Sequence, residues 1–163
     1  MRPLASLLSA TLLGLLAACG ATAAARERGP LPTPLVVVDR AGESYDLDAL
    51  LAGGRPLTLV FWQSWCESCL AEAPQVAAAA RELEGHVAFV GVVPGPDAVV
   101  DQAAVDAAIE RFGLPAPQVR DHDLVLTRGF GVDGTPTVLV LGRRREELYR
   151  GHELPPDWSA WLE

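Results

Sequence analysis

Two cysteines, Cys66 and Cys69, separate an apolar run from a segment with helical composition. The run before them, residues 57–62, is apolar almost throughout, which is typical of a central strand covered on both faces. The segment after them continues to Glu84 and is followed by Gly85, a common residue just beyond a helix C-terminus. A strand that leads directly into a helix in this way predicts an α/β domain. Pro74 lies inside the expected helix and should bend it.

The rest of the chain alternates in the same manner. Apolar runs at 35–38, 87–93 and 137–141 predict further strands, and apolar residues at helical spacing between Val105 and Phe112 predict a second helix. This helix should be capped by Asp97 or Asp101 and should end at Gly113. Shorter elements are expected at 118–120 (strand), 123–130 (helix), 146–150 (strand) and 157–162 (a final helical turn or two). The arginines at 143–145 are then expected at the solvent-exposed tip of a hairpin, and the alternative is a docking patch.

Composition limits the size of the fold and the class of partner. The chain has 163 residues, enough for one globular domain, and its 13 basic and 21 acidic residues give a formal net charge of −8. All of the basic residues are arginine. An acidic surface repels phosphate backbones, so we expect no nucleic acid partner. Three cysteines are too few for a disulfide-stapled miniprotein, and their odd number leaves at least one with a separate role.

The N-terminal residues have the layout of a secretory signal peptide. Arg2 precedes an apolar run of about fifteen residues, shorter than the ~20 that span a bilayer. The run ends with small residues before Cys19 and resembles the bacterial lipoprotein processing box. We therefore expect a signal peptide at 1–18, lipidation of Cys19, a flexible tether over 19–34, and a folded domain over 35–163 held at a membrane outside the cytoplasm. Two alternatives are cleavage within 21–25, which would discard Cys19, and an uncleaved anchor.

The spacing of Cys66 and Cys69 places both sulfur atoms on one side of the first helical turn, within reach of a disulfide. The positive end of the helix dipole favours a thiolate on Cys66 and lowers its pKa. Cys66 should then attack a disulfide of a partner, and Cys69 should resolve the mixed disulfide. The alternatives are half of a zinc site and a purely structural disulfide. The chain has no second cysteine pair and its three histidines are scattered, so we expect no metal site.

Two longer motifs carry a family resemblance. The segment 61–69, together with Glu72 and Pro74, and the segment 131–137 resemble the thioredoxin superfamily, specifically its membrane-tethered TlpA/ResA/CcmG-like branch. The similarity covers roughly residues 35–152. It implies a thioredoxin-like fold, with a central mixed sheet flanked by helices and an added helix and strand before the loop of Pro136. It also implies extracytoplasmic thiol–disulfide exchange that uses no cofactor besides the Cys66–Cys69 disulfide.

The resemblance also implies partners and roles for single residues. The partners are disulfide-bearing proteins, often the haem-binding cysteines of apocytochromes c, and a thiol-reductant donor in the membrane. Cys66 matches an exposed nucleophile, Cys69 a buried resolving thiol, and Pro136 a cis-proline facing the disulfide. The surface that selects the substrate is expected around Trp65, Glu67, Ser68 and Thr135, with the Thr135 backbone pairing with the bound polypeptide.

Two glutamates bear on the chemistry. Glu72 lies one turn beyond Cys69, where a partly buried carboxyl would exchange protons with the thiols; the alternative is a solvated surface glutamate. Glu67 places a negative charge between the cysteines, which raises the thiol pKa and favours the disulfide, as in a moderately reducing protein.

Two other functions on the same fold are a copper-binding assembly factor of the SCO type and a peroxiredoxin-like peroxidase. The first usually has CxxxC and a ligand histidine, and the second a Pro-and-Thr pocket upstream of the cysteine; this chain shows neither.

Overall fold

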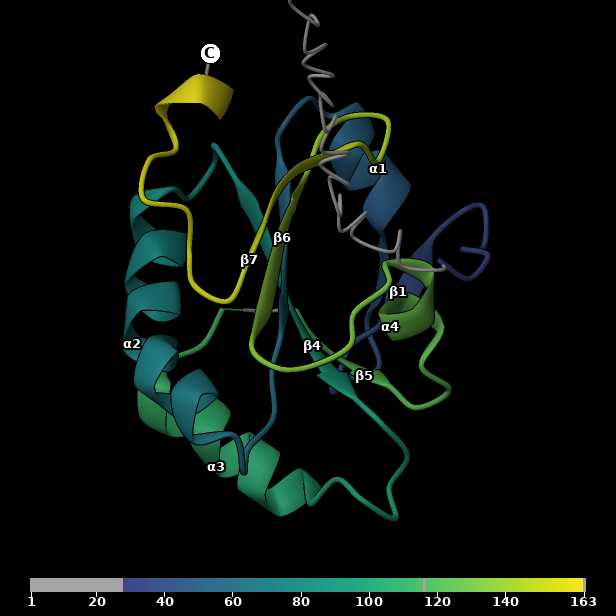
Figure 1. Ribbon diagram of the computed structural model, residues 1–163, viewed down its shortest axis with the longest axis vertical. Coiled ribbons are helices and arrows are strands. Elements are labelled where there is room, and N and C mark those ends of the chain that lie inside the picture. The colour runs from purple at the N-terminus through teal and green to yellow at the C-terminus, as the bar shows by residue number, and fades with distance from the viewer. Residues whose placement is uncertain (1–27, 116, 163) are drawn as a thin grey trace, which may run out of the picture.

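The centre of the molecule is a five-stranded mixed sheet, shown in Figure 1. The computed structural model describes residues 28–115 and 117–162. Its elements in chain order are β1 (Val36–Val38), β2 (Ser44–Asp46), α1 (Leu47–Ala52), β3 (Leu57–Phe61), α2 (Glu67–Glu82), β4 (Ala88–Pro94), α3 (Gln102–Phe112), β5 (Gln118–Asp121), α4 (Val125–Gly129), β6 (Thr137–Leu141), β7 (Glu147–Gly151) and a 3-10 turn (Ser159–Trp161). The strands of the main sheet follow the order β5-β4-β3-β6-β7, and β1 pairs with β2 in a small separate ribbon.

Strand β3 occupies the middle of the sheet. It runs parallel to β4 and antiparallel to β6, with Leu59 opposite both Val90 and Leu139. All five residues of β3 are buried, as its uninterrupted apolar pattern predicts. The hairpin formed by β6 and β7 completes one edge of the sheet, and β5 forms the other, parallel to β4.

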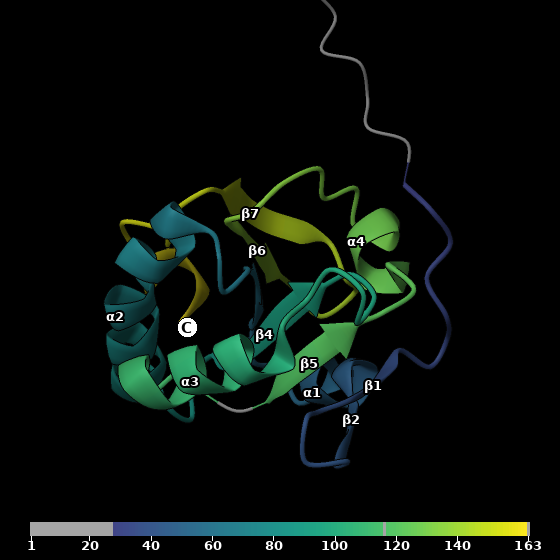
Figure 2. The same cartoon turned by 90° about the horizontal axis from the view of Figure 1, so that it is seen from below.

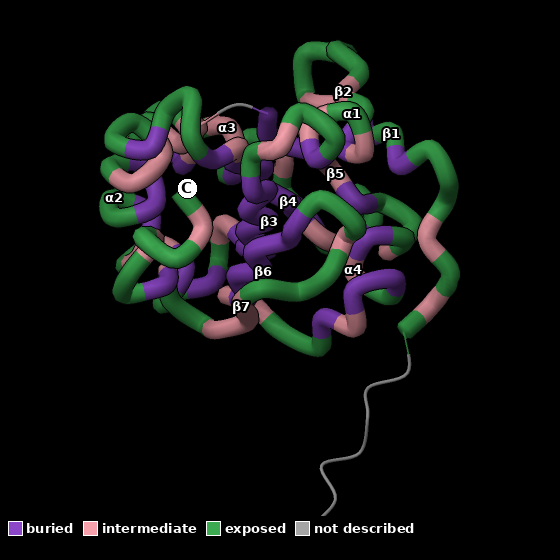
Figure 3. The backbone as a smooth tube through the Cα atoms, turned by 90° about the horizontal axis from the view of Figure 1, so that it is seen from above, coloured by how far each residue is buried: buried purple, intermediate pink, exposed green. Residues whose placement is uncertain are grey.

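Two layers of helices cover the sheet. Helices α2 and α3 lie on one face, while α1, α4 and the β1–β2 ribbon lie on the other (Figure 2). Alternate residues of β3 serve the two layers: Leu59 and Phe61 join the larger core cluster, and Val60 packs with Val76 of α2 on the opposite face. Figure 3 shows buried residues concentrated on the central strands β3, β4 and β6, and exposed residues mostly towards the outside of the molecule. This is the flanked mixed sheet that the resemblance implied.

Helix boundaries follow local capping. Cys66 is the N-cap of α2, and the helix ends at Glu82, two residues before the expected end. Asp101 caps α3 by accepting hydrogen bonds from two backbone amides, and Gly113 ends it in the left-handed conformation. Sequence reasoning missed β2 and α1. The available signal for α1 was its N-cap, Asp46, followed by leucines at helical spacing. This signal is weak because the helix is only six residues long.

Residues 29–34, expected in the flexible tether, pack against the domain. The backbone amide of Gly29 donates to the carbonyl of Arg128 at 2.8 Å. Leu31 packs on the larger core cluster, directly over Gly129, where any Cβ would collide with the leucine side chain. The packed part of the chain therefore begins before Leu35. The expected leader 1–18, Cys19 and the first part of the tether lie outside the described residues. Within the described ranges, no helix is long and apolar enough to cross a membrane.

The hairpin tip differs from the solvated turn that the three arginines predict. Arg145 forms a two-pronged ion pair with Asp48 of α1, at 2.6 Å through Nε and 2.5 Å to the second carboxylate oxygen. It also donates to the carbonyl of Pro32. Asp48 in turn accepts the backbone amide of Leu35 at 2.8 Å. Arg145 thus ties the hairpin to α1 and to the N-terminal segment, a contact that charge patterning alone does not reveal.

Candidate active site

The loop from β3 into α2 is held by two hydrogen bonds to residues that are distant in the sequence. The indole of Trp62 donates to the Gln118 side chain at 2.9 Å, a buried bond that ties the loop to β5. Gln118 can approach this closely because Gly91 lies between them, and a Cβ on Gly91 would collide with the amide. The amide of Gln63 donates to the carbonyl of Pro94 at the end of β4, at 2.5 Å. The start of α2 is therefore fixed to the carboxyl ends of the parallel strands.

Cys66 and Cys69 form a disulfide at this start of α2, with their Cα atoms 5.2 Å apart. The expected pairing of the two cysteines is confirmed. Cys66 lies in extended conformation as the N-cap, and its sulfur accepts the backbone amide of Cys69 at 3.2 Å. The hydroxyl of Ser68 lies 3.5 Å from the same sulfur. After reduction, these groups and the helix dipole would stabilise a thiolate on Cys66.

Burial does not distinguish the two cysteines. Cys66 is 6% exposed and Cys69 is 5% exposed. The expectation of an exposed Cys66 is wrong for this disulfide form, because its side chain turns inward and packs in one apolar cluster with Trp62 and with Val100, which precedes α3. The exposed residue of the motif is Trp65, at 69%.

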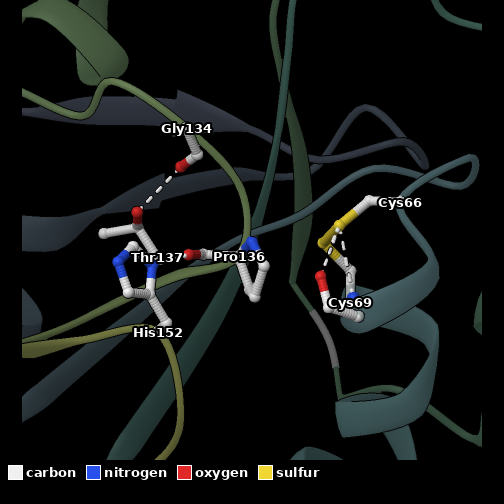
Figure 4. The surroundings of a disulfide bond; sticks show 7 residues. Cys66, Cys69, Gly134, Pro136, Thr137 and His152 are labelled. Atoms are coloured by element: carbon white, nitrogen blue, oxygen red, sulfur yellow. Dashed lines mark hydrogen bonds between the residues drawn. A yellow bond between two sulfur atoms is a disulfide. The ribbon is translucent and has the colours of Figure 1, made fainter.

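Pro136 faces the disulfide from the loop that leads into β6 (Figure 4). Its bond to Thr135 is cis, which confirms the conformation expected from the motif. The loop is closed by Thr137, whose hydroxyl donates to the carbonyl of Gly134 at 2.8 Å. Because β6 is antiparallel to β3, the beginning of β6 lies beside the end of β3 and brings Pro136 to the cysteines.

A mostly apolar cavity extends behind the disulfide, between α2 and the sheet. Its lining residues include Cys69, Glu72, Pro136 and His152, together with the apolar side chains of Val76 and Phe89. Burial raises the pKa of the Glu72 carboxyl, and the nearby negative charge of Glu153 raises it further. Glu72 is therefore partly buried and shares a cavity with Cys69. This position has the features of the proton-exchanging carboxyl considered above, rather than those of a fully solvated glutamate.

The residues expected to bind substrate occupy two positions. Trp65 and Thr135 line one shallow groove beside the disulfide, together with Val132 and Asp133 of the Pro136 loop. Glu67 and Ser68 are exposed on the first turn of α2 and do not line this groove. The structure thus brings Cys66, Cys69 and Pro136 together, with the groove on one side and the Glu72 cavity on another.

Sequence reasoning missed His152. Its Nδ1–H donates to the carbonyl of Pro136 at 2.8 Å, although the residues are sixteen positions apart. A lone histidine after a strand carries no recognisable motif, and only the pairing of β6 with β7 shows its location. In the described part of the chain, no group of three or more His, Cys, Asp or Glu side chains has a geometry that could hold a metal ion.

A family model described as Redoxin matches residues 25–157. The chain belongs to the redoxin family. Among its relatives, the thiol-disulfide oxidoreductase ResA of Halalkalibacterium halodurans is 29% identical over 112 residues, which cover 68% of this chain and 60% of that protein. The soluble secreted antigen MPT53 of Mycobacterium tuberculosis is 34% identical over 86 residues, which cover 51% of this chain and 45% of the antigen. This redoxin chain therefore matches about half of the length of its curated relatives.

A solved structure supports the fold assignment of this redoxin. It belongs to a secreted disulfide oxidoreductase of Mycobacterium tuberculosis, described as homologous to DsbE of Escherichia coli. The two structures superpose with a TM-score of 0.62 at 24% identity, over 76% of this chain and 85% of the other. This superposition confirms the thioredoxin-like fold expected from the motifs, and the family match together with the similarity to ResA confirms the expected resemblance to ResA-like proteins.

Proposed function

We propose that this protein is an extracytoplasmic thiol–disulfide oxidoreductase that reduces disulfides of proteins. The observation that carries the proposal is the Cys66–Cys69 disulfide at the N-terminus of α2, facing Pro136. A helix N-terminus favours the thiolate that attacks a disulfide, and the second cysteine lies close enough to release the product. The names of two relatives, a thiol-disulfide oxidoreductase and a disulfide oxidoreductase, support the same chemistry.

Reduction proceeds in two exchange steps. The Cys66 thiolate attacks one sulfur of the substrate disulfide, a Cys66–substrate bond forms, and the other substrate sulfur leaves as a thiolate that takes a proton from water. Cys69 then gives its proton to the Glu72 carboxylate and attacks the Cys66 sulfur, which releases the second substrate thiolate. The substrate gains two electrons, and the Cys66–Cys69 disulfide re-forms. A thiol donor at the membrane must return these electrons.

The direction of electron flow follows from charge. Glu67 in the first turn of α2 opposes a neighbouring thiolate and so favours the disulfide form of the pair, as a reductant requires.

The substrates would be polypeptides that lie in the groove beside Trp65 and pair with the Thr135 backbone. Apocytochromes c with oxidised haem-binding cysteines are one such class, in keeping with the resemblance to the cytochrome-maturation branch. Lipidation of Cys19 would hold the protein at the membrane that contains its electron donor.

Mixed-disulfide trapping tests this proposal. Cys69→Ser leaves the attacking thiol and removes the resolving one, so the purified variant should remain covalently bound to an unfolded disulfide-bearing polypeptide, and the complex should dissociate on addition of dithiothreitol. The matched variant, Cys66→Ser, should form no such complex and should reduce no disulfide. If both variants trap equally well, or neither does, the assigned roles are wrong. In native cells, the proteins captured by Cys69→Ser decide the substrate: a set without apocytochromes would exclude the cytochrome role.

A further inference from the structure

His152 extends the candidate site beyond the residues of the two motifs. It directly follows β7, whose last residue, Gly151, pairs with Val138 of β6. Because of this antiparallel pairing, His152 lies beside the beginning of β6. It is on the far side of Pro136 from the disulfide (Figure 4). There its Nδ1–H donates to the Pro136 carbonyl at 2.8 Å.

The turn that carries His152 is itself fixed. The Tyr149 hydroxyl donates to the carbonyl of Glu153 at 3.0 Å and so closes the turn around the histidine. Gly151 is required beneath this phenol, because any Cβ there would collide with the hydroxyl oxygen. The pairing of Gly151 with β6 holds the backbone before His152, and the hydrogen bond to Glu153 holds it after His152. The imidazole therefore reaches Pro136 from a backbone that is already fixed.

The imidazole also lines the cavity that contains Cys69 and Glu72. Because the carbonyl can only accept, Nδ1 carries the proton in the neutral ring, and protonation adds a positive charge at Nε2 without breaking the bond to Pro136. The groups that share the cavity or the turn with this charge are Cys69 and Glu72 of α2, Glu153 and the Tyr149 hydroxyl. Arg150 does not face the cavity, since it binds Glu147 and the carbonyl of Phe130.

We propose that His152 is a positioning residue for thiol–disulfide exchange. It holds the Pro136 loop against the disulfide, and its protonated ring supplies a positive charge to the cavity of Cys69 and Glu72. This charge favours the thiolate and carboxylate forms over the neutral ones, and therefore maintains exchange as the pH falls. The inference rests on the proposed function, because it assigns His152 a part in that reaction.

Two variants separate the hydrogen bond from the charge. His152→Asn keeps a donor near the position of Nδ1 but cannot become charged, and His152→Leu removes both. We expect His152→Leu to slow reduction of a small disulfide by about three- to tenfold at pH 8, the usual effect of one lost hydrogen bond, and by more towards pH 5, because this variant also lacks the charge. His152→Asn should stay within about twofold of the wild type at pH 8 and fall behind by at least about threefold towards pH 5. His86→Asn, at an exposed position before β4, is the matched control and should follow the wild type.

The reaction of the reduced thiols with iodoacetamide, followed over the same pH range, provides an independent measurement, because it needs no disulfide substrate. The same ordering of variants should appear there. If His152→Leu matches the wild type at all pH values, or if His152→Asn is no better than His152→Leu at pH 8, the role of His152 is refuted. If the wild type and His86→Asn fail to reduce any disulfide while the alkylation rates still order as expected, the proposed function fails and the role of His152 in thiol activation survives. Circular dichroism and Tm confirm that each variant is folded.

Discussion

The Glu72 carboxyl lies in an apolar cavity beside Cys69, and burial together with the charge of Glu153 raises its pKa. A carboxyl with this property holds a proton at a higher pH than a surface glutamate and is suited to exchange it with a thiol. The same burial has a cost, because an ionised group in an apolar cavity destabilises the fold. Sequence spacing places Glu72 one turn from Cys69, but burial determines its chemistry.

Replacing Glu72 by glutamine should therefore stabilise the protein at neutral pH. A group whose pKa is raised by folding stabilises the fold fully below its unfolded pKa and loses that contribution as the pH rises through its folded pKa. Thermal unfolding should show a higher Tm for Glu72→Gln at pH 7 and no difference below about pH 4. Glu82→Gln, near the exposed end of α2, is the control and should leave Tm unchanged. A lower Tm for Glu72→Gln at pH 7 would contradict the cause given for its raised pKa.

The same variant should slow disulfide reduction, since it cannot accept the Cys69 proton.

Among the secondary structure elements, the β6–β7 hairpin connects distant parts of the chain. Its start presents Pro136 to the disulfide, its end carries His152, and its tip binds α1 through Arg145 and Asp48. The side chains of Arg145 and Asp48 are 21% and 31% exposed, so solvent screens this ion pair only in part. The hydrogen bonds from Arg145 lower the pKa of Asp48.

Replacing Arg145 by glutamine should destabilise the protein by about 1–2 kcal/mol at pH 7, since Asp48 loses its partly buried partner. A depressed pKa means that the contribution of the pair is present above the unfolded pKa of Asp48 and is lost as the pH falls through its folded pKa. The difference from the wild type in urea unfolding should accordingly shrink towards acid pH. Arg144→Gln at the neighbouring position should change stability by less than about 0.5 kcal/mol. Equal effects of the two substitutions would show that the ion pair contributes nothing.

At the scale of the whole molecule, the N-terminal segment is part of the domain. Leu31 covers Gly129 of α4, and the backbone of Gly29 is bonded to Arg128. These contacts lie with α4 on the face of the sheet opposite α2 (Figure 2), and the disulfide is at the start of α2. A chain anchored at Cys19 would thus enter the domain away from α2.

Truncation of Leu31 to alanine should measure how firmly this segment is held. We expect a loss of about 1–2 kcal/mol in the free energy of unfolding, the usual cost of removing a partly buried leucine side chain. Val36→Ala in β1, where the valine is 46% exposed, should cost less than about 0.5 kcal/mol. If Leu31→Ala proved as mild as this control, residues 29–34 would belong to the tether, as the sequence pattern suggests.

The sequence by itself determined the pairing of Cys66 with Cys69, the place of this pair between β3 and α2, and most of the strands. These features are local: an apolar run marks a buried strand, a cap and a terminal glycine mark a helix, and a spacing of three residues brings two sulfur atoms together. The sequence pattern did not predict β2 and α1, because a strand of three residues and a helix of six residues give little periodic signal. The pattern of Leu57–Phe61 also indicated a central strand correctly.

Tertiary structure alone decided which distant residues meet at the disulfide. The antiparallel pairing of β6 with β3 and β7 brings Pro136 and then His152 to the cysteines, and neither strand pairing nor register can be read from local pattern. Cys66 is buried in an apolar cluster that also contains Val100, just before α3. The protonation of Glu72 likewise depends on a cavity whose walls come from several elements. Long-range packing sets solvation and charge at the site, and these in turn set the pKa values on which exchange depends.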